Sequence, residues 1–143
     1  MQRHAALAGL SEEHHHGLVW SRRLTKLAAG KLETSPKEVM GEFLSVWERE
    51  INPHFRREEE ILLPVFARTD HYWVAGIQEM LRQHVELRRN IWLLREDPHP
   101  DVIRQTGELL QEHIRLEERE VFPLIQQEAD ESLLARIDEL LHV

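Results

Sequence analysis

The sequence predicts an all-α fold, an up-down-up-down antiparallel four-helix bundle with a short fifth helix at the C-terminus. The 143 residues contain only six glycines and no alternating β-branched runs, and helix stop signals recur near residues 30–35, 69–70, 97–100 and 129–130. Between these signals, apolar residues recur at helical spacing. Short connections between long amphipathic helices make neighbouring helices antiparallel, and we expect one domain over residues 1–143.

The first predicted helix covers residues 11–29. Ser11, which two glutamates follow, has the character of its N-cap, and Gly30 is the glycine expected just beyond its end. The second predicted helix begins with Ser35-Pro36-Lys37-Glu38. This segment has the sequence of a capping box, with serine as the cap, proline at the first helical position and glutamate reaching back to the cap.

The second predicted helix contains a proline and ends near residue 68. Because Pro53 has no backbone N–H to donate, we expect a kink just before His54. The prolines ten residues after His54 and His113 should likewise bend or end their helices. Asp70 is the predicted cap of the third helix, which runs to about residue 96.

The last two predicted helices follow a turn that contains two prolines. The turn covers residues 97–100, and the fourth helix then runs to about residue 128. Asp130 is placed as the cap of the short fifth helix. One face of that helix is apolar and consists of Leu133, Leu134, Ile137, Leu140 and Leu141. The tryptophans are predicted to pack in the core or between helices: Trp20, Trp47, Trp73 and Trp92.

One motif occurs twice. His54-Phe55-Arg56-Arg57-Glu58-Glu59 returns as His113-Ile114-Arg115-Leu116-Glu117-Glu118. A spacing of four residues places histidine and glutamate on the same face of an α-helix, so an imidazole and a carboxylate can bind one metal ion together. Two such motifs predict a site for two metal ions.

The candidate ligands lie on the apolar stripes of the predicted helices. Each of the four long helices points one histidine inward, and two of them add a glutamate: His14, His54, Glu58, His84, His113 and Glu117. A purely structural hydrogen-bond network is the alternative. However, two buried carboxylates without compensation would cost several kcal/mol each, and no core lysine is available. Arg88, the only basic residue near the inward face of the third helix, cannot neutralise both glutamates, which favours metal ions.

Composition excludes several classes of partner and site. Eighteen basic against 26 acidic residues give a net charge of −8, which argues against nucleic acid and anionic membranes as main partners. The absence of cysteine excludes disulfides, thiolate zinc sites and iron–sulfur clusters, so any metal must be held by nitrogen and oxygen. No segment approaches the roughly 20 apolar residues that span a bilayer, and we expect a cytoplasmic protein.

The order and spacing of these fragments resemble the haemerythrin-like, or HHE cation-binding, domain. The similar parts are Leu10 to His15, the two His-x-x-x-Glu motifs with their prolines, and Gln83-His84. The resemblance implies a non-haem di-iron centre, with an oxo, hydroxo or water bridge, inside a four-helix bundle. His14, His54, His84 and His113 would be terminal ligands, and Glu58 and Glu117 would bridge the two irons. His15 stays open as the alternative to His14.

The sequence departs from the oxygen-carrying members of that family. Those proteins have five histidines and a longer His-to-Asp spacing in the last helix, whereas this chain has Met80 and Arg88 four residues on either side of His84. The fifth histidine is missing, and His15, His16 or Tyr72 are left as candidates to complete the ligand set. More than one open coordination position would then remain, which favours sensing, redox chemistry or iron handling over oxygen storage.

Three functions stay open on the sequence. The first is a metal-binding module that binds or senses oxygen, nitric oxide, redox state or iron, with a separate protein as its partner. The second is a di-iron enzyme that activates oxygen or peroxide or reduces a small oxidant, although no separate general acid, base or nucleophile is apparent. The third is a structural or interaction bundle that a metal only stabilises. Manganese or zinc would suit the same ligands, and the oligomeric state is not determined.

Overall fold

A computed structural model describes residues 2–32 and 35–142. These residues form helices and no strand, which confirms the predicted all-α class. In chain order the segments are α1 (Ala5–Ala28), α2 (Pro36–Val46), η1 (Trp47–Ile51), α3 (Asn52–Arg57), η2 (Glu58–Leu62), α4 (Leu63–Phe66), α5 (Ala75–Glu96), α6 (Pro100–Leu116), η3 (Glu117–Val121), α7 (Phe122–Glu128) and α8 (Glu131–Leu141), where η denotes π-helix.

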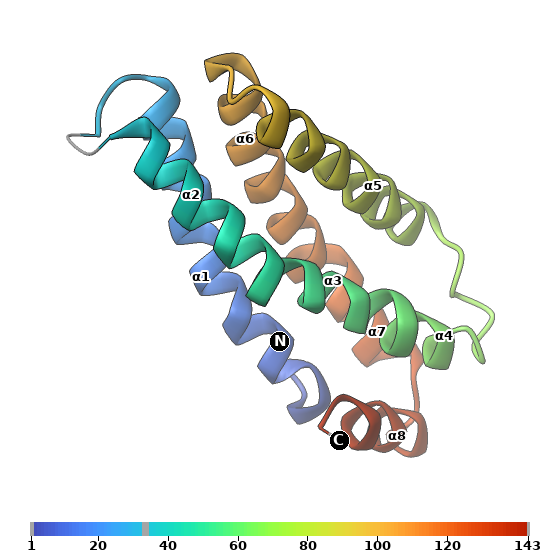
Figure 1. The fold of residues 1–143 in the computed structure, drawn as a ribbon. Helices are drawn as coiled ribbons and strands as arrows, with labels where there is room; N and C mark the ends of the chain where they lie inside the picture. The colour runs from blue at the N-terminus through green and yellow to red at the C-terminus, as the bar shows by residue number, and fades with distance from the viewer. Residues whose placement is uncertain (1, 33–34, 143) are drawn as a thin grey trace.

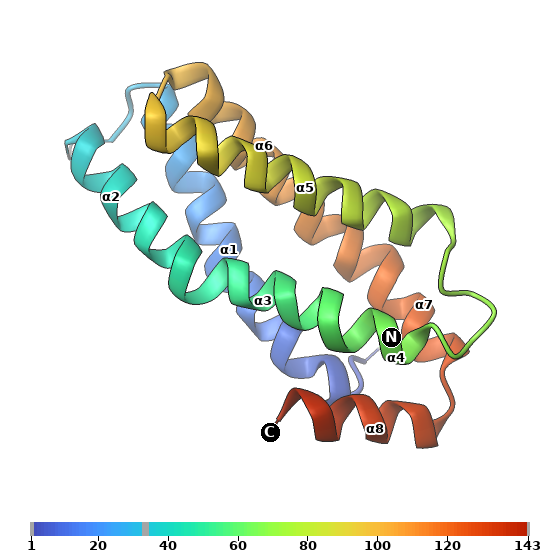
Figure 2. The same cartoon turned by 45° about the vertical axis from the view of Figure 1, so that its right-hand side comes forward.

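Several segments join without a break into longer helices. Segments α2 to α4 form one continuous helical stretch over residues 36–66, and α6 to α7 form another over 100–128. Together with α1 and α5 these make four long stretches, which lie along one another, with the shorter α8 across one end (Figures 1 and 2). Helix α8 packs against α1, η2 and α4. Within the described residues, no helix is both long enough and apolar enough to cross a membrane.

The first helix begins earlier than predicted. Helix α1 starts at Ala5, and His4 is its N-cap, because the His4 Nδ1 atom accepts a hydrogen bond from the N–H of Ala6 at 3.0 Å. Ser11 therefore lies inside the helix, where its hydroxyl donates to Glu118 at 2.6 Å. Packing of the preceding turn against α8 outweighs the local preference of serine for a cap. The predicted exit is confirmed, since Gly30 has a φ of +71°.

Of the three other predicted caps, Ser35 and Asp130 lie at the predicted helix starts, whereas Asp70 does not. Ser35 precedes α2, but its side chain makes no capping hydrogen bond. Asp70 lies in a turn region, and α5 begins only at Ala75. At the start of α8, by contrast, Asp130 Oδ1 accepts a hydrogen bond from the N–H of Leu133 at 2.8 Å, as an N-cap should.

The prolines inside the long helices are accommodated by π-helical turns. Each of η1, η2 and η3 ends two residues before a proline, namely Pro53, Pro64 and Pro123. The residue preceding each proline donates its N–H to the carbonyl five positions back, which is the π-helical pattern. A wider turn relieves the clash between the proline ring and the carbonyl four residues earlier. The helices therefore continue past Pro64 and Pro123 rather than ending there.

The apolar core consists of two clusters. The first gathers residues such as Trp20, Phe43, Leu87 and Ile103, and the second gathers residues such as Leu7, Phe66, Ile77, Ile125 and Ile137. On each long helical stretch, the candidate ligands lie in the sequence between residues of the first cluster and residues of the second. A polar layer thus separates two apolar halves.

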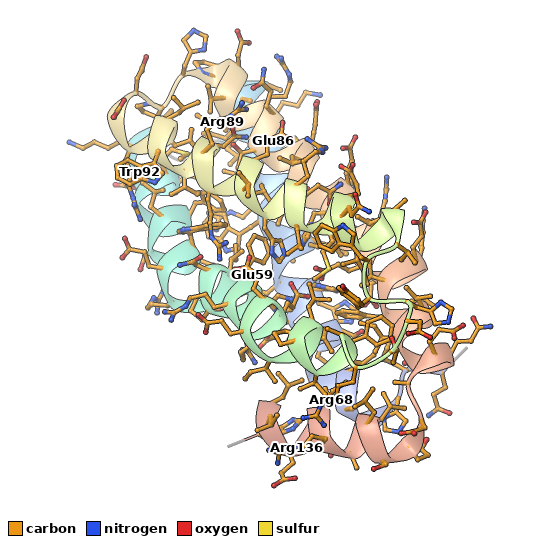
Figure 3. All side chains as sticks on the ribbon, turned by 90° about the vertical axis from the view of Figure 1, so that its right-hand side faces the viewer. Glu59, Arg68, Glu86, Arg89, Trp92 and Arg136 are labelled. Carbon is orange, nitrogen blue, oxygen red and sulfur yellow. The ribbon has the colours of Figure 1, made fainter. Side chains whose placement is uncertain are left out.

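The tryptophan prediction holds for two positions only. Trp20 and Trp47 are buried in the first cluster. Trp73 and Trp92 are exposed, by 56% and 67% respectively. Trp92 lies on the outer face of α5, near Glu86 and Arg89 (Figure 3). Helical spacing therefore does not by itself place a tryptophan in the core.

Candidate metal centre

Six buried side chains from all four long helical stretches form the polar layer. They are His14 on α1, His54 on α3, Glu58 at the start of η2, His84 on α5, His113 on α6 and Glu117 at the start of η3. None is more than 6% exposed, and both glutamates are fully buried. The structure thus brings together all six residues that the sequence singled out.

The six residues divide into two groups that share both glutamates. We call His14, His54, Glu58 and Glu117 position A, and His84, His113, Glu58 and Glu117 position B. Within each position the four potential ligand atoms, one from each residue, all lie within 4.8 Å of one another. Each position therefore offers two imidazole nitrogens and two carboxylate oxygens.

Each glutamate turns one oxygen toward each position. Glu117 Oε1 lies 2.8 Å from His14 Nε2, while Glu117 Oε2 lies 2.9 Å from His113 Nε2. Glu58 Oε2 lies 3.2 Å from His54 Nε2, and Glu58 Oε1 lies 3.2 Å from His84 Nε2. This is the placement that two bridging carboxylates require.

Several atoms in the layer lack the hydrogen bonds that burial normally demands. Both oxygens of Glu58, the Oε2 atom of Glu117 and the Nε2 atom of His54 are buried without a hydrogen-bond partner. A buried carboxylate left in this state costs several kcal/mol unless a positive charge compensates it. Arg88 does not supply that charge, since its guanidinium pairs with Glu59, 2.7 Å away. The charge must come from the layer itself, as histidine protons or as bound cations, and a set of imidazole nitrogens and carboxylate oxygens fits hard or borderline divalent cations.

The comparison with protein families agrees with this geometry. A family model described as the hemerythrin HHE cation binding domain matches residues 5–125. The chain belongs to the hemerythrin HHE cation-binding family. The match includes all six residues of the layer and ends before α8. Comparisons with curated proteins and with solved structures gave no match.

A second set of side chains in this HHE domain holds the outer nitrogen of each imidazole. Glu13 lies 2.5 Å from His54 Nδ1, and Glu59 lies 2.5 Å from His84 Nδ1. Glu118 lies 3.2 Å from His14 Nδ1, and Gln83 Oε1 lies 2.7 Å from His113 Nδ1. Figure 3 shows Glu59 between the η2 segment and α5. Such contacts set the tautomer and leave Nε2 free for the centre.

The sequence pattern assigned these four residues no role. The signal was nevertheless present, because each directly adjoins a residue of the layer. Glu13 precedes His14 and Gln83 precedes His84, while Glu59 and Glu118 each follow the glutamate of a motif. Periodicity does not identify them, because neighbouring residues on a helix point in different directions.

The carboxylates of this outer set are held in turn by basic or hydroxyl groups. Glu13 pairs with Arg57 at 2.7 Å, and Glu59 with Arg88 at 2.7 Å. Glu118 accepts the Ser11 hydrogen bond, and Arg3 lies 3.6 Å away. Burial raises the pKa of Glu13, but hydrogen bonds with His54 and Arg57 outweigh this effect and lower the pKa to about 2.

The layer also perturbs the titration of its own residues in the metal-free chain. Burial lowers the pKa of His14, yet hydrogen bonds with Glu117 and Glu118 outweigh it and raise the pKa to about 9. Burial likewise opposes the hydrogen bonds that raise the pKa of His84 to about 10. For Glu117, burial raises the pKa, but the charge of His113 and its hydrogen bond lower it well below the usual range. Histidine protons thus compensate the buried carboxylates.

The residues considered for a fifth nitrogen or oxygen ligand lie elsewhere. His15 is exposed, and His16 contacts Glu50 at 2.9 Å on the surface. Tyr72 is 47% exposed. Neither His15 nor His16 belongs to position A or position B. On α1, therefore, His14 and not His15 is the residue that lies in the layer.

A cavity connects the layer with the surface of the HHE domain. Its volume is about 160 Å³, and His14, His54 and His113 contribute to its wall. Apolar side chains, including those of Ile51, Leu110 and Ile114, line much of the rest. Exposed residues at its outer part include Arg49 and the pair formed by His16 and Glu50. The cavity has room for a small molecule beside three of the four histidines.

Proposed function

We propose that the layer holds two metal ions, one at position A and one at position B, and that both are iron. The observation that supports this most directly is that Glu58 and Glu117 each present one oxygen to each pair of histidines. His14, His54, His84 and His113 would be terminal ligands through Nε2. We place the centre in an up-down-up-down antiparallel four-helix bundle that spans residues 1–143.

We further propose that the protein binds or senses a small ligand, with oxygen or nitric oxide as the candidates, or responds to redox state. An iron pair, when bound, supplies reversible electron transfer and coordination positions for such a ligand. The cavity supports this function because it reaches the layer and much of its wall is apolar, which suits small uncharged molecules. A separate protein would then receive the signal.

The residues of the chain have distinct parts in this function. Glu13, Glu59, Glu118 and Gln83 hold the imidazoles in one orientation, so the site is formed before metal enters. Ile51, Leu110 and Ile114 keep the cavity wall apolar. The proposal favours a binding protein over an enzyme, because the part of the cavity wall formed by these three residues is apolar and suits the binding of a small uncharged molecule.

The test is elemental analysis with a visible spectrum of the purified full chain, reduced without oxygen and then exposed to air. We expect roughly two irons per chain and a ferric absorption band that appears in air. His14→Gln should reduce the metal content, because it removes a terminal nitrogen, whereas His15→Gln should leave metal content and spectrum unchanged. The reverse result would overturn the choice of His14.

Other outcomes separate the remaining functions. Zinc alone in the isolated protein, or a folded chain that binds no iron, would contradict the di-iron centre and support a structural metal. Steady consumption of oxygen, peroxide or nitric oxide by the iron-loaded protein would instead support the enzyme. Glu58→Gln is informative in both cases, since it removes one of the bridging charges while nearly preserving side-chain size.

A further inference from the structure

We infer that the two metal positions are unequal, with position A binding metal more tightly than position B. The reason is Gln83, which occupies a place where the other half of the site has a carboxylate. This inference rests on the proposed two-metal centre, but it does not depend on the metal being iron.

The layer has an internal symmetry. Each half of the chain contributes to it one His-x-x-x-Glu-Glu motif and one histidine outside the motif, His14 or His84, which we call the single histidine. The residue before the single histidine contacts the motif histidine of its own half, and this residue is Glu13 in the first half and Gln83 in the second. The residue after the motif glutamate contacts the single histidine of the other half, and here both residues are glutamates, Glu59 and Glu118. The symmetry is therefore broken at one place.

The break falls on one position only. At position A, His54 and His14 are both held by carboxylates, Glu13 and Glu118. At position B, His84 is held by the Glu59 carboxylate, but His113 is held by the neutral Gln83 amide. The inner ligands of the two positions are the same in kind and number, so the outer partner of one histidine is a difference in charge between them.

A carboxylate and an amide affect an imidazole differently. A carboxylate that accepts the Nδ1 hydrogen bond places negative charge behind the ring and makes Nε2 a stronger electron donor toward a cation. An amide oxygen accepts the same hydrogen bond and sets the same tautomer, but it has no charge to contribute. Removal of such an outer partner typically changes metal affinity by about 10–100-fold. We expect a difference of that order between the two positions.

The orientation of the Gln83 amide follows from its surroundings. Gln83 is 5% exposed, and its Oε1 atom lies 2.7 Å from His113 Nδ1. With Nε2 of His113 directed at the centre, Nδ1 carries the ring proton and donates it to the amide oxygen. Gln83 is thus a positioning residue that acts on the centre through His113.

Unequal positions would give the protein a form with one metal ion. When metal is scarce, position A fills first and position B stays empty. When metal is withdrawn, position B empties first. Position B is then the exchangeable position, where a metal-handling function of this site would take place.

The experiment is a titration of the metal-free full chain with Co²⁺, followed by calorimetry and by visible absorption. The wild type should bind two ions in two steps whose dissociation constants differ by about 10–100-fold. Gln83→Glu should tighten the second step and bring the two steps together. Gln105→Glu, which adds the same charge on the exposed face of α6, should leave the separation unchanged.

A second variant keeps the test decisive if Gln83→Glu does not fold. In Glu13→Gln, an amide holds one histidine of position A, as Gln83 does at position B. The first binding step should therefore become weaker, so that its dissociation constant approaches that of the second step. Two equal steps in the wild type would overturn the inference. So would a Gln83→Glu protein that folds and keeps the wild-type separation. Failure to bind any Co²⁺ would overturn the two-metal centre itself.

Discussion

At the scale of single residues, each histidine of the layer uses its two ring nitrogens differently. In His54, for example, Nε2 faces the Glu58 carboxylate at 3.2 Å while Nδ1 faces Glu13 at 2.5 Å. The outer contact prevents the ring from turning and determines which nitrogen is free. A layer that contains two fully buried glutamates can therefore keep one arrangement in the absence of metal.

Stability of the metal-free protein should fall as the pH rises above neutrality. The pKa of His14 is raised to about 9 and that of His84 to about 10, from about 6.5 in the unfolded chain. A raised histidine pKa stabilises the folded state below pH 6.5, and this contribution is lost as the pH approaches the folded value. For His14 the contribution is on the order of 3 kcal/mol. Urea unfolding at pH 7 and at pH 10 measures the loss.

Bound metal should remove this dependence at high pH. A metal ion requires neutral imidazoles, so the loaded protein has no histidine proton to lose there, and protons compete with the metal only as the pH falls. The loaded protein should therefore keep its stability between pH 7 and pH 10. An equal alkaline loss with and without metal would contradict the placement of metal at these histidines.

At the scale of elements, the π-helical turns follow the metal motifs directly. Glu58 begins η2 and Glu117 begins η3, while the turn between each histidine and its glutamate stays α-helical. Histidine and glutamate thus remain on one face. The extra residue of the π turn comes after them and rotates the following residues, so that Leu62 and Val121 pack in the second apolar cluster. The motif prolines are part of this arrangement, because the wide turn accommodates their rings.

The contact between α1 and α6 depends on a glycine. A Cβ atom at Gly107 would lie 2.9 Å from the Ser21 carbonyl oxygen and 2.9 Å from Thr25 Cγ2. Gly107→Ala should therefore force the helices apart and lower the free energy of unfolding by roughly 1–3 kcal/mol. Denaturant unfolding of the metal-free chain measures the change.

Gly41→Ala is the matched control for this prediction. Gly41 lies on α2 with no atom within 4 Å of an added Cβ. Alanine has the higher helix propensity, so this variant should be more stable by roughly 0.5–1 kcal/mol. Similar effects of the two substitutions would mean that the α1–α6 contact is looser than the structure shows.

At the scale of the whole molecule, the polar layer lies between two apolar clusters and draws residues from every long helix. Metal bound there would connect all four stretches, and unfolding would release it. Free metal at 100 times its dissociation constant should therefore stabilise the protein by about 2.7 kcal/mol for each site. Thermal unfolding at increasing metal concentration should show a rising Tm.

Two substitutions make this prediction specific. Glu117→Gln removes a carboxylate charge that both positions share and should abolish most of the rise in Tm. Glu108→Gln, on the exposed face of α6, should show the full rise. A rise that is the same in both variants would indicate that metal binds elsewhere on the surface.

The sequence by itself determined the helical class, the six residues of the layer and the cap at Asp130. These features follow from local geometry, since a spacing of four residues in a helix defines a face whatever lies opposite. The sequence did not determine the start of α1, because packing against α8 extends this helix toward the N-terminus, from Ser11 to Ala5. Nor did it predict the π turns, since a proline in a helix is compatible with a kink, an end or a wider turn.

Only the tertiary structure decided which side chains act together. The contact between His14 and Glu118 joins residues 104 positions apart, and that between His54 and Glu13 joins residues 41 positions apart. Periodicity along one helix cannot specify such pairs, because they depend on how neighbouring helices are rotated and shifted against each other. The resemblance had already implied that Glu58 and Glu117 are shared, but the amide of Gln83 behind His113 became visible only when the four helices were packed together.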